Sequence, residues 1–248
     1  MIDLHCHILP NLDDGPHTIE ESVAMVRLAW KDGIRMIVAS SHITPGIYDN
    51  SPLRIVETTD KLNERLKEEK IPVRIVPGAD NRIFPEMIEN PESFLRINTV
   101  SPYFLLEFPH DMVPPGSGNL AESLLNEGLI PVITHPERNR ELQIKPEKLG
   151  PFVKMGCLVQ VTAMSLTGDF GWFARDTSEY FMKEGLVHVI ATDAHDTRKR
   201  PPVLSRGLKQ AAEWVGEEAA GRMVLETPEM IVNSISGEQE AASGKRET

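Results

Sequence analysis

The 248-residue chain lacks most of the features that mark a secreted or membrane-spanning protein. Its two cysteines, Cys6 and Cys157, are too few for a disulfide framework, which indicates a reducing compartment. No uninterrupted apolar run reaches about 18 residues, so no spanning helix is expected. The first seven residues lack the basic and apolar regions of a signal peptide. We therefore expect a cytoplasmic protein with no direct membrane insertion.

The chain also lacks an excess of basic residues. It has 26 Lys and Arg against 37 Asp and Glu, a formal net charge of −11. This excess of acidic residues argues against nonspecific binding of nucleic acid, although it is compatible with a local basic pocket. Neither Gly-x4-Gly-Lys-Ser/Thr nor Gly-x-Gly-x-x-Gly occurs, so both common nucleotide-binding fingerprints are absent. The sequence has no Cys-x5-Arg loop either, which excludes a cysteine-dependent phosphatase.

Short apolar runs rich in Ile, Val and Leu alternate with longer amphipathic segments. The runs cover roughly 2–8, 34–40, 73–77, 103–108, 130–134, 157–161 and 187–192. Uninterrupted apolar runs of this length are typical of buried parallel strands. The pattern predicts a parallel α/β fold, either a doubly wound sheet or a closed barrel.

The boundaries of the amphipathic segments carry helix start and stop signals. Thr18 and Glu21 match a capping box. A glycine separates a helix from the following strand at three junctions, which are Gly33, Gly128 and Gly185. With no internal linker evident, we expect a single domain over residues 1–235 and a polar, disordered tail over 236–248.

Histidines and carboxylates gather at or just past the C-terminal ends of the predicted strands. They are His5, His7, Asp14, His42, Asp80, Glu107, His135, Asp193 and His195. Each of these residues, taken alone, has an ordinary structural explanation; Asp13-Asp14-Gly15, for example, is commonly just a turn. In a parallel barrel, however, strand ends converge on one mouth, so the combined pattern favours a metal centre. Three histidines do not fit this pattern and receive no role: His17, His110 and His188.

The types of ligand narrow the choice of metal. Imidazole and carboxylate without thiolate suit Mn, Fe or Zn. Cys6 alternates to the face opposite His5 and His7 and is expected to be a small buried apolar residue. Nine candidate ligands are too many for one ion, whereas a cluster of two or three metals would use them all. Such clusters generate a hydroxide nucleophile and clamp both oxygens of a phosphoryl transfer.

Two arginines are candidates for phosphate recognition. Arg138 closes the sequence His-Pro-Glu-Arg that begins at His135, and Arg200 lies a few residues past His195. A guanidinium binds phosphate through two parallel hydrogen bonds. The alternative for Arg138 is a salt bridge with Glu137 or with another carboxylate at the rim.

The segments "MIDLHCHILPNLDDGP", "LLEFP", "PVITHPERN" and "ATDAHD" resemble the polymerase-and-histidinol-phosphatase (PHP) superfamily. More narrowly, they resemble the bacterial PHP-type protein tyrosine phosphatases of capsule and exopolysaccharide systems. The resemblance runs in order from residue 1 to about residue 202. It implies a distorted (β/α)7 TIM-like barrel with three divalent metal ions, often manganese. It also implies a substrate, the phosphotyrosine tail of a bacterial tyrosine autokinase.

Position by position, the resemblance also distributes the ligands among three metals. The three sets are His5, His7, Asp80 and Asp193; Asp80, Glu107 and His135; and Asp14, His42 and His195. Asp80 bridges the first two metals, and Arg138 and Arg200 match arginines that contact the phosphate. The chain departs from the family where Asp80 replaces the usual Glu, and where Ser-Ser-His-Ile around His42 replaces Thr-Pro-His-His.

We expect from these residues direct hydrolysis of an aryl phosphate, with in-line attack by hydroxide and with Arg138 and Arg200 neutralising equatorial charge. A phenolate leaves readily, so a strong general acid is not required. One alternative is a small-molecule phosphatase such as histidinol phosphatase. Another is a non-enzymatic metal-binding protein that docks on a kinase. Turnover of different phosphoesters distinguishes the first alternative, and metal content without turnover would support the second.

Overall fold

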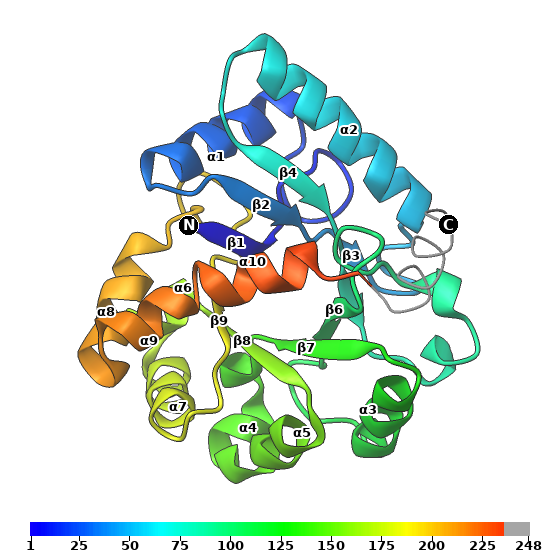
Figure 1. Cartoon of the computed structure of the whole chain (residues 1–248), viewed down its shortest axis with the longest axis vertical. Helices are drawn as coiled ribbons and strands as arrows, with labels where there is room; N and C mark the ends of the chain where they lie inside the picture. The colour runs from blue at the N-terminus through cyan, green and yellow to red at the C-terminus, as the bar shows by residue number, and fades with distance from the viewer. Residues whose placement is uncertain (236–248) are drawn as a thin grey trace, which may run out of the picture.

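The computed structural model describes residues 1–235 and has a mixed α/β fold (Figure 1). The expected tail, 236–248, lies outside the described residues. The strands are β1 (Ile2–Cys6), β2 (Met36–Ala39), β3 (His42–Ile43), β4 (Arg74–Pro77), β5 (Asp80–Arg82), β6 (Tyr103–Glu107), β7 (Ile130–Thr134), β8 (Leu158–Thr162) and β9 (Val189–Ala191). The α-helices are α1 (Ile19–Lys31), α2 (Pro52–Glu68), α3 (Ser117–Asn126), α4 (Arg140–Ile144), α5 (Gly150–Met155), α6 (Ala163–Leu166), α7 (Trp172–Lys183), α8 (Ser205–Val215), α9 (Glu217–Arg222) and α10 (Glu226–Asn233). Short 3-10 helices lie at η1 (Pro85–Met87), η2 (Pro91–Ser93), η3 (Pro136–Arg138) and η4 (Pro146–Leu149).

The strands form two sheets, in the orders β1-β2-β4 and β3-β5-β6-β7-β8-β9. Among the described residues, every pairing between the named strands is parallel. Each of the seven predicted apolar runs contains a strand, so the predicted parallel α/β fold is confirmed. The runs were predictable because a strand buried on both faces has no polar alternation.

The strands β3 and β5 are not predicted from the sequence. They contain His42 and Asp80, which were expected just after strands. After a break at 40–41, β3 continues the path of β2, and after a break at 78–79, β5 continues β4. Gly78 lies at the second break, where a Cβ atom would be 2.6 Å from Val38 Cγ1. Beyond the breaks His42 pairs with Asp80. These two residues therefore lie inside short strands rather than after strands, because pairing resumes in the second sheet.

Strands β1 and β9 lie side by side and bring the two sheets together. Cys6 forms a parallel bridge with Ala194, and the Asp193 amide donates to the His5 carbonyl at 2.7 Å. Cys6 is fully buried, as predicted. A central apolar cluster draws on strands of both sheets and on α10; its buried members are Leu4, Val38, Val76, Ile97, Leu105, Val132, Val189, Ala191, Ile231 and Val232.

Helix α10 covers the N-terminal ends of the strands. It crosses the centre of the view in Figure 1. Ser101, just before β6, donates its hydroxyl to the Ile231 carbonyl at 2.7 Å. The opposite, C-terminal ends of the strands carry the predicted site residues. Between residues 1 and 235 no helix is both long enough and apolar enough to cross a lipid bilayer.

The predicted helix boundaries are largely observed. Thr18 Oγ1 accepts from the Glu21 amide at 3.2 Å, while Glu21 Oε2 accepts from the His17 amide at 2.7 Å rather than from Thr18. The second hydrogen bond of the capping box therefore comes from the His17 amide, one residue before the expected donor. Three glycines have left-handed φ angles at the helix ends: Gly33 at +95°, Gly128 at +74° and Gly185 at +67°. Glycine suits these positions because it has no Cβ atom.

Candidate metal and phosphate site

All nine predicted metal ligands lie together at the C-terminal ends of the strands. They fall into four overlapping groups, each with ligand atoms within 4.8 Å of one another: His7, Asp14, His42 and His195; His5, His7 and Asp193; His5, Asp80 and His135; and His42, Asp80 and Glu107. Seven of the nine are buried, whereas His42 is partly exposed and Asp14 is exposed. A cluster of this kind is expensive to bury unless its charges are compensated.

Two of these residues have strained backbones. His135 directly follows β7 and has a φ angle of 33°. Asp193 lies two residues after the end of β9 and has a φ angle of 52°. A left-handed conformation costs roughly 1–2 kcal/mol for a residue with a Cβ atom. Backbone hydrogen bonds hold both turns: the Arg138 amide donates to the His135 carbonyl at 3.0 Å, and the Asp193 amide donates to the His5 carbonyl of β1 at 2.7 Å. Such strain is commonly found at functional sites.

Three imidazoles are held through Nδ1, which leaves Nε2 facing the cluster. His5 Nδ1 donates to Gln160 Oε1 at 2.9 Å, and His7 Nδ1 donates to Asp13 Oδ2 at 2.8 Å. His195 Nδ1 donates to a backbone carbonyl at 3.0 Å. Metal-binding histidines are commonly oriented in this way by carboxylates, amides and carbonyls. Asp13 and Gln160 have no predicted role, although the Asp13-Asp14 pair was a signal for the former.

The His5 and His7 rings meet at a distance that calls for a positive charge between them. Their Nε2 atoms are 3.2 Å apart, and both lie 3.4 Å from Asp193 Oδ1. Two neutral imidazole lone pairs would repel each other there. Burial alone would lower the pKa of His7, but the charge and hydrogen bond of Asp13, with Asp193, raise it to about 10. The raised pKa of His7 thus favours a proton between the two rings, at the position where a metal cation would also be stabilised.

One carboxylate oxygen of Asp80 accepts a hydrogen bond from the protein, and the other faces the ligand nitrogens. Thr134 Oγ1 donates to Oδ1 at 3.1 Å. The other oxygen, Oδ2, faces three imidazole nitrogens: His42 Nδ1 at 3.5 Å, His5 Nε2 at 3.6 Å and His135 Nε2 at 3.7 Å. It is buried and has no hydrogen-bond partner among residues 1–235. Asp therefore reaches the centre of the cluster from this position, where the resembling family usually has Glu.

Glu107 completes the test of whether the site suits cations. Glu107 Oε2 and His42 Nδ1 are 3.8 Å apart and buried, and in the described chain neither makes a hydrogen bond. Arg82 Nη2 lies 3.0 Å from Glu107 Oε2 as an ion pair. Burial, followed by the charge of Asp80, raises the pKa of Glu107 to about 8. Asp80 Oδ2 and His42 Nδ1 face each other at 3.5 Å without a hydrogen bond in the described chain, and such oxygen and nitrogen atoms, without thiolate, fit divalent cations.

Both predicted arginines lie over the cluster and share one partner. Arg138 Nη1 donates to Asp193 Oδ2 at 2.5 Å, and Arg200 Nη2 donates to the same oxygen at 2.6 Å. Arg138 therefore pairs with a carboxylate of the site and not with its neighbour Glu137. Glu137 instead accepts from the Ser165 hydroxyl at 2.6 Å beneath the site.

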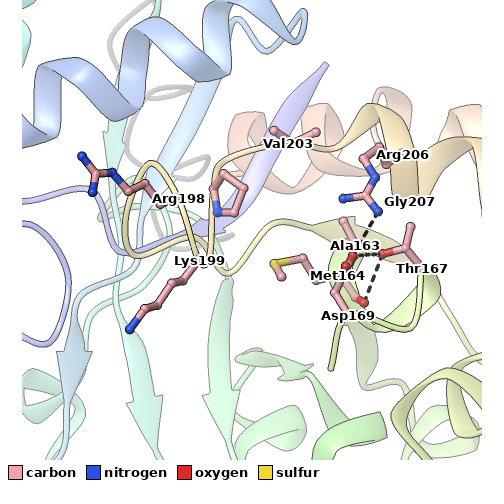
Figure 2. Close-up of a pocket in the computed structure, with 10 residues that line it drawn as sticks. Ala163, Met164, Thr167, Asp169, Arg198, Lys199, Val203, Arg206 and Gly207 are labelled. Atoms are coloured by element: carbon pink, nitrogen blue, oxygen red, sulfur yellow. Dashed lines mark hydrogen bonds and ion pairs between the residues drawn. The ribbon is translucent and has the colours of Figure 1, made fainter. Parts of the chain in front are cut away.

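The loop that carries Arg200 is anchored by close helix packing. Gly207 of α8 lies against α6, where a Cβ atom would be 2.7 Å from Ala163 Cα (Figure 2). The Arg200 carbonyl accepts from the His195 amide at 2.9 Å. Arg200 Nε is buried and finds no hydrogen-bond acceptor within the described residues, so one donor is available to a ligand. Arg198 and Lys199 of the same loop are exposed and lie away from Gly207 in Figure 2.

A cavity of about 70 Å³ opens above the cluster. It is lined by Asp14, His42, Glu107, His110, His135, Arg138, Asp193, His195 and Arg200. Eight of these nine are predicted site residues. The three predicted site residues that do not line the cavity, His5, His7 and Asp80, are fully buried. His110 is the exception, because the sequence assigns it no role. Its place three residues after Glu107 was the signal that could have identified it.

Histidines, carboxylates and two arginines around a small cavity define a site suited to metal-assisted hydrolysis of a phosphoester. The chain belongs to the capsular polysaccharide synthesis CpsB/CapC family, whose model matches residues 1–233. The tyrosine-protein phosphatase YwqE of Bacillus subtilis is 41% identical over 236 residues, which cover 94% of this chain and 92% of YwqE. The tyrosine-protein phosphatase CpsB of Streptococcus pneumoniae is 30% identical over 243 residues, 94% of this chain and 98% of CpsB.

The fold agrees with that relationship. A crystal structure from a study of YwqE from Bacillus subtilis and CpsB from Streptococcus pneumoniae, described as unique metal-dependent tyrosine phosphatases, superposes with a TM-score of 0.90. Its sequence is 38% identical, and the alignment covers 95% of each chain. The predicted resemblance is thereby confirmed at the level of the family.

Proposed function

We propose that this chain is a metal-dependent phosphatase that hydrolyses phosphotyrosine on a bacterial tyrosine autokinase of a capsule or exopolysaccharide system. Family membership and the activity named for its relatives support the reaction. The observation that carries the proposal is the convergence of nine nitrogen and oxygen ligands beneath two arginines that share Asp193. The kinase partner follows from the resemblance of the sequence to phosphatases of such systems.

The proposed cofactors are three divalent metal ions, preferably manganese, with iron or zinc as alternatives. The sets that would hold them are His5, His7, Asp80 and Asp193; Asp80, Glu107 and His135; and Asp14, His42 and His195. Distances within the third set support it, because Asp14 Oδ1 lies 3.3 Å from His195 Nε2 and 3.8 Å from His42 Nε2. When bound, divalent cations activate water as a nucleophile at neutral pH and neutralise charge on the phosphoryl group.

The residues of the chain itself bind and orient the substrate. Arg138 reaches the cavity from η3 and Arg200 from the loop between β9 and α8, and both are held in place by the shared Asp193 oxygen. Their remaining donors, including Arg200 Nε, are available to oxygens of a phosphoryl group. Because the leaving phenolate is stable, the binding of charge contributes more to this reaction than proton donation does.

We further propose that residues 1–235 form one domain, a distorted seven-stranded TIM-like barrel of the PHP type. Two of its strands would each be interrupted, as β2 with β3 and as β4 with β5. Support comes from the hydrogen bonds between β1 and the end of β9 and from the apolar cluster that these strands share with α10. A cytoplasmic location remains part of the proposal and is supported by two buried, unpaired cysteines.

The deciding experiment compares two phosphoesters with purified protein loaded with Mn²⁺. A phosphotyrosine peptide should be hydrolysed with a much higher kcat/KM than histidinol phosphate, and a chelator should abolish the activity. A preference for histidinol phosphate would contradict the proposal in favour of a small-molecule phosphatase. Bound metal without turnover of either ester would instead support a non-enzymatic interaction protein.

A further inference from the structure

A second hollow adjoins the cavity on the side of α4 and α7. Its volume is about 330 Å³, and it is lined by His110, Asp111, Arg138, Arg140, Gln143, Phe170 and Ala174. Two of these residues, His110 and Arg138, also line the cavity above the ligand cluster. The two spaces therefore adjoin at His110 and Arg138, and a group extending from the cavity past Arg138 would enter this hollow.

Phe170 lies at the boundary between the hollow and the arginines. The Arg138 guanidinium carbon is 4.4 Å from the centre of the Phe170 ring, and that of Arg200 is 5.7 Å away. The ring is only partly buried. It thus offers apolar surface directly beside the two groups expected to hold the phosphate.

The size of the cavity excludes the rest of a phosphotyrosine side chain. A cavity that accommodates benzene is on the order of 150 Å³. The cavity here is about 70 Å³ and would also contain the phosphoryl group. The phenyl ring of the substrate must therefore lie outside it, in a space that opens from it.

Neither of the other nearby spaces is lined by Phe170 or by the two arginines. A groove of about 600 Å³ shares Asp14 and His195 with the cavity, and its wall includes Ala24 and Met25. Its wall does not include Arg138 or Arg200, so it does not adjoin the two groups expected to hold the phosphate. No phenyl ring lines this groove within residues 1–235. The pocket drawn in Figure 2 is lined in part by Arg198 and Lys199, and none of its lining residues also lines the cavity.

We propose that the hollow lined by Phe170 and His110, here called the aryl pocket, binds the phenyl ring of the phosphotyrosine substrate. Phe170 packs against that ring and thereby favours aryl phosphates over alkyl phosphates. The proposal rests on the proposed function, because it names the part of the site that would recognise the tyrosine. Favourable contacts between two aromatic rings correspond to about a tenfold change in affinity.

The test uses Phe170→Leu, which keeps an apolar side chain but removes the ring. Binding of a non-hydrolysable phosphonomethyl-phenylalanine peptide to the Mn²⁺-loaded protein should weaken about tenfold. Binding of methylphosphonate and inhibition by inorganic phosphate should stay unchanged. With the phosphotyrosine peptide as substrate, KM should rise while kcat changes little. Phe170→Tyr, which restores a ring, should recover wild-type binding.

Two matched variants separate the proposal from its alternatives. Phe173→Leu changes the same residue type three positions away, where the ring is 72% exposed and outside the aryl pocket, and should have no effect. His17→Ala changes the wall of the larger groove and should also leave peptide binding intact. Loss of peptide affinity in His17→Ala but not in Phe170→Leu would place the ring in that groove and overturn the proposal.

Equal weakening of peptide, methylphosphonate and inorganic phosphate in Phe170→Leu would also overturn it, because Phe170 would then act only by holding the arginines. Melting temperature and metal content of each variant identify a folding defect, and Phe170→Tyr keeps the test valid in that case. If the wild type hydrolyses no phosphotyrosine, the proposed function fails. The binding comparison between peptide and methylphosphonate still reports on the aryl pocket.

Discussion

Two neighbouring regions of the molecule bury carboxylates in opposite ways. Near the start of β1, Asp3 accepts from the Thr192 amide at 2.9 Å and from the Thr192 hydroxyl at 2.5 Å. At the C-terminal strand ends, Asp80 Oδ2 faces imidazole nitrogens and accepts no hydrogen bond from residues 1–235. Both side chains are fully buried, so the difference lies in their partners rather than in their exposure.

The pKa values follow this difference. Burial raises the pKa of Asp3 to about 7, because its hydrogen bonds with Thr192 compensate only part of the cost of desolvation. Burial would also raise the pKa of Asp80, but His5 and the other imidazoles lower it below its usual range. A carboxylate supplied with neutral donors stabilises the fold, whereas one surrounded by ligand nitrogens remains charged and suited to a cation.

The largest expected effect tests the charged member of this pair. Asp80→Asn keeps the shape of the side chain but removes its charge, so we expect metal-dependent turnover of a phosphotyrosine peptide to fall by about 1000-fold. Steady-state kinetics at saturating Mn²⁺, together with metal content, would measure the loss.

The matched control applies the same change to Asp3. Asp3→Asn retains one oxygen for Thr192, and we expect turnover per folded molecule to remain within about tenfold of the wild type. An equal loss of turnover in both variants would show that the two regions do not differ in function. Full activity of Asp80→Asn would remove Asp80 from the metal site.

The second prediction concerns stability. Asp3→Ala leaves the buried Thr192 amide without its acceptor and the Thr192 hydroxyl with only the His5 carbonyl at 3.4 Å, and should lower the free energy of unfolding by about 3 kcal/mol. Because the folded pKa of Asp3 is raised from 3.8 to about 7, its stabilisation is complete below pH 4 and shrinks as pH rises towards 7. Urea unfolding at pH 5 and pH 8 would measure both effects. A loss that is larger at pH 8 would contradict this assignment.

The contrast also explains which parts of the molecule were predictable from sequence. Strands such as β7 and β8 were predictable because burial on both faces leaves uninterrupted apolar runs. The candidate ligands could be located because parallel strands end at one side of the fold. Their assignment to metals came from the resemblance to a known family and not from these patterns.

The partners of the ligands could not be predicted, because they depend on which side chains face each other across the fold. Gln160 contacts His5 from 155 positions away, through the ring nitrogen that points away from the cluster. Thr134 supports Asp80 from two strands further along the sheet. The breaks before β3 and β5 were also missed, because Gly78 signals a close approach only once Val38 is known to be opposite.

The third prediction concerns one of these unpredicted partners. Asp13→Asn replaces the charged acceptor of His7 Nδ1 with a neutral amide and should weaken Mn²⁺ binding by about 10- to 100-fold. Isothermal titration with Mn²⁺ would measure this change. Asp13 accepts from the Gly15 amide at 3.0 Å, and Asp49 accepts in the same way from the Gly46 amide at 2.7 Å but lies outside the site, so Asp49→Asn is the control. A similar loss in both variants would mean that Asp13 only shapes its loop.

The fourth prediction concerns the pH dependence of metal binding. With protein groups alone, the pKa of Glu107 is raised to about 8, chiefly by burial, and the pKa of His7 is raised to about 10 by Asp13 against the effect of burial. Both groups must lose a proton to bind a metal. Between pH 6 and pH 8 the Mn²⁺ affinity should therefore rise about 100-fold per pH unit, falling to about tenfold per unit above pH 8.

Calorimetric titrations from pH 6 to pH 9, in buffers of different ionisation enthalpy, would count the released protons. Glu107→Gln should remove the steeper part of this dependence, because only His7 would then release a proton. Asp3→Asn should leave the dependence unchanged, although the pKa of Asp3 is also raised, because Asp3 accepts from Thr192 and is not one of the nine ligands. A pH dependence altered equally by both variants would show that the two regions titrate as one cluster, and the distinction between supporting and metal-binding carboxylates would fail.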